Sequence, residues 1–240
     1  SGAGLVSAVV PDCINTAFES SCIEAMSYPV KDKGGFFSKE SFDDIVDFVR
    51  DKDVICFGMG LGVFDDALYL LESLLELKKP MVIDADGLNV LSKNVNLLKK
   101  INSPVILTPH PKEFSRLIGQ TTAEVLKNRL KLVKEFAKKN NVILILKMAD
   151  TLISNGESIF INTSGNPGLS TGGSGDVLSG IIASLIAQNN DVLHASCMGV
   201  FLHGLSADLA LSKYSEASLL PTDVINHITN AIEAIKTKAQ

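Results

Sequence analysis

Gly-Asn-Pro-Gly-Leu-Ser-Thr-Gly-Gly-Ser-Gly-Asp, residues 165–176, is a glycine-dense stretch that ends in one carboxylate, Asp176. An apolar helical pattern follows directly over Val177–Ala187. Backbone with so few side chains can approach a ligand closely, and the N–H groups at the start of a helix attract anions. Because the stretch runs without a break into a core helix, we favour a phosphate-binding loop over a flexible Gly/Ser linker.

The carboxylate of Asp176 needs a separate explanation, since it would repel a phosphate group. It makes better sense as a general base aimed at a substrate hydroxyl beside the phosphate. We expect Thr171–Ser174 and the start of the helix to hold the phosphate. The loop therefore predicts phosphoryl transfer, which depends mainly on positioning and charge neutralisation.

The composition narrows the class of protein. The chain has 240 residues, 46% of them apolar, and a formal net charge of −5. These values fit one large α/β domain or two small ones, and the lack of a basic excess argues against nucleic-acid binding. No apolar run is expected to span a membrane. Four scattered cysteines and the absence of a basic leader segment predict a cytoplasmic protein.

Strands alternate with helices along most of the chain. Short apolar runs predict strands over residues 5–10, 54–57, 81–83, 105–107 and 142–146. Leu152–Ser154 and Ser158–Ile161 flank Asn155-Gly156, which predicts a two-residue hairpin. The longest helical patterns cover residues 121–140, 192–212 and 222–236. The alternation predicts one α/β domain with a mainly parallel sheet and an antiparallel edge hairpin.

Glycine-rich and polar motifs follow the predicted strands. They are Gly58–Gly62, Asp84 with Asp86, His110 with Glu113, and Lys147–Thr151. The carboxyl ends of parallel strands line one crevice, the usual ligand site of such sheets, so these motifs should converge on Gly172–Asp176. The two aspartates suit a cation or ribose site, and Glu113 would balance charge through Mg²⁺ and water. Plainer interpretations are a simple tight turn for Gly58–Gly62, an N-cap for Asp86 and a surface position for His110.

Several segments together carry a family resemblance. They are Gly-Asn-Pro-Gly-Leu-Ser-Thr-Gly-Gly-Ser-Gly-Asp (165–176), Leu-Thr-Pro-His-Pro-Lys-Glu (107–113), Asp-Ala-Asp-Gly-Leu-Asn (84–89), Gly-Met-Gly-Leu-Gly (58–62), Ser-Gly-Ala-Gly-Leu-Val (1–6) and Leu-His-Gly-Leu-Ser-Ala-Asp-Leu-Ala (202–210). They resemble the ADP/ATP-dependent NAD(P)H-hydrate dehydratase family over essentially the whole chain. The resemblance implies a ribokinase-like three-layer α/β/α sandwich and a single domain over residues 1–240.

The resemblance also implies an activity, the repair of hydrated NADH or NADPH. The 6-hydroxyl of the hydrated nicotinamide ring is phosphorylated by ADP or ATP, and phosphate is then eliminated. Asp176 would be the base at this hydroxyl, and the hydrated dinucleotide would contact Gly60, Gly62, His110 and Asp176. The adenine nucleotide would contact Lys147, Met148, Ala149, Asp150, Thr151, Thr171, Gly172, Gly173, Ser174 and Gly175.

The sequence departs from the family pattern in three places. The family usually opens with a further strand, a glycine-rich turn and a helix before Ser-Gly-Ala-Gly, so the domain is expected to lack its first strand and helix here. Met148 stands where the nucleotide segment usually has glycine, and its side chain is expected to crowd the nucleotide. Met59 replaces a usual proline, with little expected effect.

Two other functions would use the same residues. A ribokinase-like kinase of a small alcohol needs the same loop and base, although His110 in place of asparagine argues against it. A nucleotide-binding sensor would keep the loop without catalysis. We also expect a homo-oligomer, and by resemblance a tetramer, because the helix over 192–211 is more apolar than one sheet face requires. His203 within it is expected to be a core or subunit-contact residue rather than a catalytic one.

Overall fold

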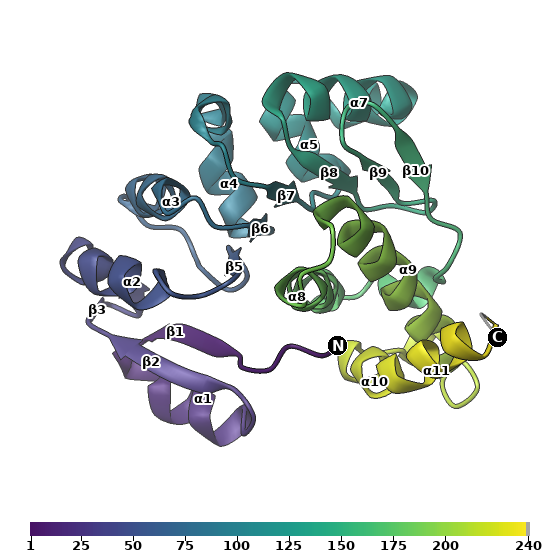
Figure 1. The fold of residues 1–240 in the computed structure, drawn as a ribbon, viewed down its shortest axis with the longest axis horizontal. Coiled ribbons are helices and arrows are strands. Elements are labelled where there is room, and N and C mark those ends of the chain that lie inside the picture. The colour runs from purple at the N-terminus through teal and green to yellow at the C-terminus, as the bar shows by residue number, and fades with distance from the viewer. Residues whose placement is uncertain (239–240) are drawn as a thin grey trace.

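A six-stranded sheet forms the centre of the protein, which is described over residues 1–238 by a computed structural model. Its strand order is β10-β9-β8-β7-β6-β5 (Figure 1). The strands are β5 (Ile55–Phe57), β6 (Met81–Ile83), β7 (Val105–Leu107), β8 (Ile143–Leu146), β9 (Leu152–Ser154) and β10 (Ile159–Ile161). Strands β5 to β8 are parallel, and β9 is antiparallel to both β8 and β10. The predicted mainly parallel sheet with an antiparallel edge hairpin is confirmed.

Alternate residues of the central strands face opposite layers, as the two-residue period of a strand requires. Val82, Ile106 and Ile145 pack on one side with α8 (Ser174–Ala187) and α9 (Val192–Ala210). Their neighbours along each strand pack on the other side with α3 (Ala67–Glu76), α4 (Asp86–Ser92), α5 (Pro111–Ile118) and α7 (Arg129–Asn140). Strands buried on both faces read as continuous apolar runs. The predicted α/β/α sandwich is therefore confirmed.

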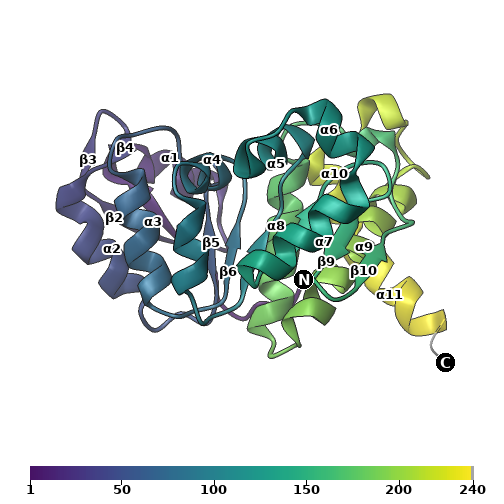
Figure 2. The ribbon, with the colours of Figure 1, turned by 90° about the horizontal axis from the view of Figure 1, so that it is seen from above.

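The N-terminal residues form a unit of their own. Strands β1 (Ser7–Pro11) and β2 (Met26–Val30) pair in parallel as a separate sheet, connected by a 3₁₀ turn (Asp12–Ile14) and α1 (Asn15–Ser21). Strands β3 (Asp32–Lys33) and β4 (Phe36–Phe37) form a small hairpin. A 3₁₀ turn (Lys39–Ser41) and α2 (Phe42–Val49) lead from there to β5. Figure 2 shows this unit at one end of the molecule and α9 to α11 at the other.

Two predicted long helices are interrupted. Thr121 and Glu124 form a capping box, but the helix that it starts, α6 (Thr122–Lys127), ends at Asn128 before α7 begins. Asn128 leaves the helical region with φ −117° and ψ 22°, as asparagine does readily because its side chain competes for backbone hydrogen bonds. The last helix is likewise divided at His227 into α10 (Pro221–Asn226) and α11 (Ile228–Lys238). The remaining 3₁₀ turns are Val95–Lys100, Pro167–Leu169 and Glu216–Ser218.

The β9–β10 hairpin has a four-residue loop, not the predicted two-residue turn. Ser154 pairs with Ile159, which leaves residues 155–158 between the strands. The Asn155 side chain accepts hydrogen bonds from the backbone N–H groups of Glu157 and Ser158 at 3.0 and 2.9 Å. Gly156 has φ +89°, and a Cβ there would lie 2.5 Å from the backbone of Lys138 in α7. Glycine is therefore needed for packing against α7 as well as for the turn.

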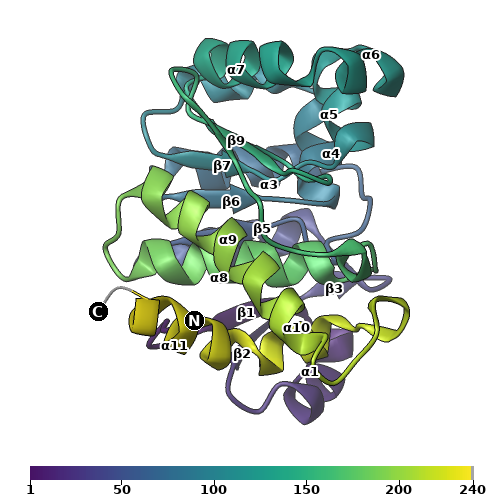
Figure 3. The same cartoon turned by 90° about the vertical axis from the view of Figure 1, so that its right-hand side faces the viewer.

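Helix α9 is long and apolar enough to cross a membrane by length and composition, although no apolar run was expected to span one. Half of it is buried inside the structure, where it packs against α8, α10 and α11 (Figure 3). Core helices of globular proteins meet the same criteria, so this is weak support for a membrane span. It is the one such helix within residues 1–238.

Candidate active site

A buried ion pair lies at the carboxyl ends of two central strands. Asp84 directly follows β6 and Lys147 directly follows β8, and Lys147 Nζ lies 2.6 Å from Asp84 Oδ1. Asp84 is 1% exposed. Its other carboxylate oxygen accepts a hydrogen bond of 2.9 Å from the Ser179 hydroxyl on α8. The pair therefore connects the carboxyl ends of β6 and β8 to α8.

The first turn of α8 rests directly on this ion pair. A Cβ added to Gly175 would lie 2.9 Å from Lys147 Nζ and 3.3 Å from Asp84 Oδ2. Gly173, which precedes the helix, has φ +89°, a conformation that favours glycine. The glycines thus let the start of α8 approach a charged group that a side chain would displace.

Asp176 lies in this first turn and is exposed. Partial burial raises the pKa of its carboxyl group, the Asp84 carboxylate raises it further, and the Lys147 ammonium lowers it. A carboxylate with a raised pKa is a better proton acceptor than an ordinary aspartate. Asp176 is therefore an accessible base that is influenced by the negative charge of Asp84 and the positive charge of Lys147.

His110 is the N-cap of α5. Its Nδ1 accepts hydrogen bonds from the backbone N–H groups of Lys112 and Glu113 at 3.1 and 3.3 Å, while Glu113 Oε2 accepts one from the His110 N–H at 2.8 Å. The sequence predicted neither interaction: it suggested a functional histidine or an idle surface one. A ring nitrogen that accepts two N–H bonds carries no proton, so His110 is neutral in this geometry.

The same contacts bear on the predicted metal role of Glu113. Glu113 is 7% exposed, and its second oxygen lies 3.4 Å from His110 Nε2. Burial lowers the pKa of His110 and raises the pKa of Glu113. Among residues 1–238, no three histidine, cysteine or acidic side chains gather closely enough to hold a metal. Glu113 therefore serves first as half of a capping box, and the described residues 1–238 build no complete cation cage.

The Gly58–Gly62 turn is tied to the neighbouring strand end. A side chain at Gly58 would collide with the backbone of Asp84 and Gly87. The backbone N–H of Gly62 donates to Asp86 Oδ2 at 2.9 Å. Asp86 is therefore neither the N-cap of α4, which is Ala85, nor a free ligand. Asp84 pairs with Lys147 and Asp86 accepts from Gly62, and the cation or ribose site at these two aspartates stays a prediction. Gly60 stays exposed, with open space beside its Cα.

The segment that the resemblance assigns to the nucleotide, Lys147–Thr151, forms a turn directly after β8. Met148 Sδ lies 3.6 Å from an Arg129 guanidinium nitrogen, and the Met148 side chain packs against the apolar core. The Thr151 hydroxyl donates to the Met148 carbonyl at 3.0 Å, which closes the turn. Ala149 and Asp150 are exposed, and Asp150 has φ +58°. The Met148 side chain is thus engaged by Arg129 and the core.

The remaining glycine-loop residues leave their backbone open. The Ser174 N–H donates to the Thr171 carbonyl at 3.3 Å, so the loop turns tightly into α8. Gly172 is exposed, and a Cβ there would touch nothing within 4 Å. This is the open, N–H-rich helix start that the sequence predicts.

Two residues of the site were missed by sequence reasoning. Ser179 was counted as part of an apolar core helix, yet it holds Asp84. Arg116 donates to the Asn89 side chain at 2.7 Å and thereby joins α5 to α4 beside His110. The sequence offered one indication for Ser179, a polar residue at a buried position of an apolar helix. It offered none for Arg116, because the partner of Arg116 lies far away in the chain.

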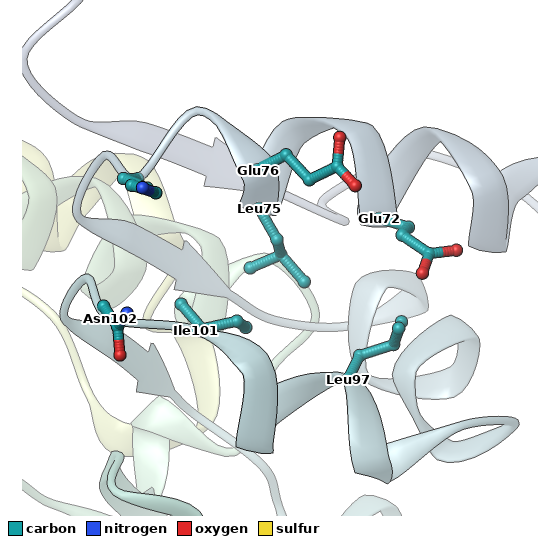
Figure 4. A pocket seen from close by; sticks show the side chains of 7 residues that line it. Glu72, Leu75, Glu76, Leu97, Ile101 and Asn102 are labelled. Atoms are coloured by element: carbon teal, nitrogen blue, oxygen red, sulfur yellow. The ribbon is translucent and has the colours of Figure 1, made fainter.

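A cavity lies away from this edge. It has a volume of about 210 Å³ and lies between the end of α3 and the 3₁₀ turn Val95–Lys100. Figure 4 shows Glu72, Leu75 and Leu97 among its lining residues. These segments lead into the amino ends of β6 and β7, opposite the end where Asp84 lies. The cavity is therefore not part of the candidate site.

The sandwich fold and the glycine loop beside a carboxylate define the ribokinase-like class. The sequence profile of the NAD(P)H-hydrate dehydratase family matches residues 1–230. The chain therefore belongs to the NAD(P)H-hydrate dehydratase family, as the motifs predicted.

Individual relatives agree with this assignment. The bifunctional NAD(P)H-hydrate repair enzyme Nnr of Moorella thermoacetica is 34% identical over 100% of this chain and 46% of its own length. The ADP-dependent (S)-NAD(P)H-hydrate dehydratase of Neisseria meningitidis is 43% identical over 63% of this chain and 53% of its own. The chain thus spans about half the length of these curated relatives.

A solved relative shows the shared fold. The ADP/ATP-dependent NAD(P)H-hydrate dehydratase of Bacillus subtilis, co-crystallised with ATP/Mg²⁺, superposes with a TM-score of 0.80. It is 26% identical, and the match covers 98% of this chain and 80% of the B. subtilis chain. Solved kinases of much lower identity share the fold alone.

Proposed function

We propose that this chain dehydrates hydrated NADH or NADPH at the expense of a nucleotide, as a metabolite-repair enzyme. The observation that carries the proposal is the exposed Asp176 in the first turn of α8, resting on the Asp84–Lys147 pair in a chain of this family. An accessible base beside an N–H-rich helix start is what a hydroxyl acceptor and a phosphoryl donor need together.

The proposed reaction has two steps. Asp176 accepts the proton of the 6-hydroxyl, and the hydroxyl oxygen takes the terminal phosphoryl group of ADP or ATP, which leaves AMP or ADP. The phosphate then departs from ring carbon 6 while the neighbouring ring carbon loses a proton, which restores the dihydronicotinamide double bond. The net change is removal of water and hydrolysis of one phosphoanhydride.

The nucleotide is supported by two relatives. The N. meningitidis relative is named an ADP-dependent enzyme, and the B. subtilis relative was co-crystallised with ATP/Mg²⁺. Mg²⁺ commonly keeps several waters and binds one or two carboxylates together with substrate phosphates. A single carboxylate such as Glu113 fits this pattern better than a cage of protein ligands, so Glu113 would hold Mg²⁺ through water. Bound in this way, Mg²⁺ would neutralise phosphate charge.

The other residues take roles that suit their positions. Gly60, Gly62 and His110 would contact the hydrated dinucleotide, because they end or begin segments at the same sheet edge as Asp176. The adenine nucleotide would contact Thr171–Gly175 through open backbone N–H groups, and Lys147–Thr151 through the turn after β8.

The proposal is tested with purified protein, hydrated NADH and either ADP or ATP. Recovery of dihydronicotinamide absorbance, with release of inorganic phosphate, is the expected result. The kinase of a small alcohol predicts instead a stable phosphorylated product and no recovery. That outcome with both donors would overturn the dehydratase proposal.

We also propose that the protein forms a homo-oligomer, a tetramer as the resemblance suggests. Exposed apolar side chains on β10 and α9 support an interface with a second copy: Phe160 (42% exposed), Ile161 (56%), Met198 (46%) and Phe201 (40%). Such a patch on an edge strand and a helix suits a symmetric contact. Light scattering at micromolar concentration tests this, and a monomer would contradict it.

We also propose that the protein is located in the cytoplasm. All four cysteines are free thiols, the state that a reducing compartment maintains. Cell fractionation with an antibody against the chain tests it, and recovery outside the cytoplasmic fraction would contradict it.

A further inference from the structure

Helix α9 carries residues 202–210, a motif of the family resemblance that the proposed chemistry does not use. Its side chains contact both ends of the glycine loop. The entry of the loop is Ser164–Asn166 and its exit is Ser174, so contacts at both ends would fix the path of the backbone between them.

At the entry, Asp208 of α9 accepts two hydrogen bonds. Asp208 Oδ2 accepts from the backbone N–H of Gly165 at 2.8 Å, and Asp208 Oδ1 accepts from the Asn166 side-chain amide at 3.0 Å. The Asn166 side chain in turn accepts from the Gly168 N–H at 3.1 Å. Bonds to a carboxylate are stronger than neutral ones, so this is a firm point of attachment.

The backbones of α9 and the loop entry also touch. The Ser164 hydroxyl donates to the Phe201 carbonyl at 2.9 Å. A Cβ on Gly204 would lie 2.6 Å from the Ser164 carbonyl carbon, and a Cβ on Gly165 would lie 3.4 Å from the Gly204 Cα. Gly165 has φ +102°, which requires glycine. The entry is therefore positioned against α9 by backbone contact as well as by Asp208.

At the exit, His203 of α9 contacts Ser174, the first residue of α8. His203 Nε2 lies 3.4 Å from the Ser174 hydroxyl oxygen, and both side chains are buried. Burial lowers the pKa of His203 to about 4, so the ring is neutral at physiological pH. His203 is therefore a core contact, as the sequence predicted, but one made to the loop.

We propose that Asp208 is a positioning residue for nucleotide binding, which acts by holding the glycine loop at its entry while His203 holds its exit. The inference rests on the proposed function of the loop. Loss of the Asp208 carboxylate frees Gly165 and Asn166, so the N–H groups that face the phosphates lose their fixed direction. The effect falls on the nucleotide and not on the hydrated dinucleotide.

The test compares Asp208→Asn with Asp191→Asn. Asp191 is a matched control, because it lies at the other end of α9 and its Oδ1 accepts one backbone N–H, from His194 at 2.9 Å. For Asp208→Asn we expect the Kd and KM of ADP to rise roughly tenfold, with the KM of hydrated NADH unchanged. Asp191→Asn should leave both substrates unaffected. Calorimetric titration with ADP reads the effect directly.

The possible results distinguish a positioning role of Asp208 from a merely structural one, and both from failure of the proposed function. If Asp208→Asn lowers only kcat, in proportion to a smaller folded fraction, Asp208 is merely structural and the proposal is wrong. If the variant does not fold, Asn166→Ala removes the other partner and should raise the ADP Kd, and an unchanged Kd would overturn the proposal. Wild-type protein that binds ADP but does not dehydrate hydrated NADH contradicts the proposed function while leaving the binding test intact.

Discussion

Lys147 Nζ lies 2.6 Å from Asp84 Oδ1, and this contact joins the ends of β6 and β8 beneath the first turn of α8. Asp84 is almost fully buried, whereas the Lys147 side chain is 21% exposed. A buried charge is tolerated only when it is paired and hydrogen-bonded, and Asp84 has Lys147, Ser179 and the Ala85 N–H as partners. The pair therefore fixes the surface against which the first turn of α8, which contains Asp176, packs.

Removal of one charge of this pair should destabilise the fold. Asp84→Ala leaves the Lys147 ammonium without its partner, and we expect the free energy of unfolding to fall by roughly 3 kcal/mol. The double variant Asp84→Ala/Lys147→Met should recover part of that loss, because no charge is left unpaired. Urea denaturation followed by circular dichroism measures both. A double variant that loses the sum of the single effects would show that the two charges are not coupled.

Gly175 should be needed for activity more than for stability. In Gly175→Ala the new Cβ would displace Lys147 Nζ, which sits at the end of a flexible side chain and can move at low cost. We expect the unfolding free energy to change by less than about 1 kcal/mol, since alanine favours a helix, while kcat falls. Gly180→Ala on the same helix is the control, because its Cβ would touch nothing. Equal activity of the two variants would refute this role of the ion pair.

The acidic limb of the pH–rate profile should report Asp176. Its carboxyl group must be ionised to accept a proton, and its pKa is raised above the usual value of about 3.8. Activity should therefore fall as the pH drops through that raised pKa. Asp84→Asn removes a negative neighbour and frees Lys147, and both changes lower the pKa of Asp176. The limb of kcat/KM should move to lower pH, and a limb that stays in place would contradict the assignment.

His203 should make the stability depend on pH. Its pKa is about 4 in the fold, whereas an unfolded histidine titrates near 6.5, so the unfolded chain binds more protons between these values. The stability that neutral His203 provides is present above pH 6.5 and is lost as the pH falls toward 4. By linkage the loss amounts to about 2 kcal/mol between pH 7.5 and pH 5.

Substitution of His203 isolates its contribution to the pH dependence of the unfolding free energy. In His203→Asn the unfolding free energy should depend less on pH over the same interval, by that amount. Parallel pH dependences of the wild type and the variant would mean that His203 does not titrate differently in the fold. Chemical denaturation at several pH values provides the comparison.

Local patterns sufficed for much of the fold. The parallel strands are continuous apolar runs because both faces are covered, and their buried residues alternate between the two layers as expected. Helix interruptions at Asn128 and His227 were missed, since the periodic apolar pattern continues across both breaks. The length of the β9–β10 loop was missed because the packing of Gly156 on α7 is a tertiary effect.

The convergence of the motifs was predictable from the sequence, but their side-chain contacts were not. The motifs after successive strands lie at one sheet edge, as predicted, since parallel strands bring their carboxyl ends together. The partners of Asp84 come from residues 63 and 95 positions further along the chain, and no local pattern encodes them. His110 and Glu113, which were predicted to contact ligands, also form the capping box of α5.

The most direct test of the account is turnover of hydrated NADH by wild-type protein and by Asp176→Asn, with ADP and with ATP. We predict recovery of dihydronicotinamide absorbance by the wild type and a loss of about 10²–10⁴-fold in kcat for the variant. Nucleotide affinity, measured by calorimetry, should be retained. Undiminished turnover by Asp176→Asn would contradict the assignment of Asp176 as the base, and absence of turnover by the wild type with both nucleotides would contradict the proposed reaction itself.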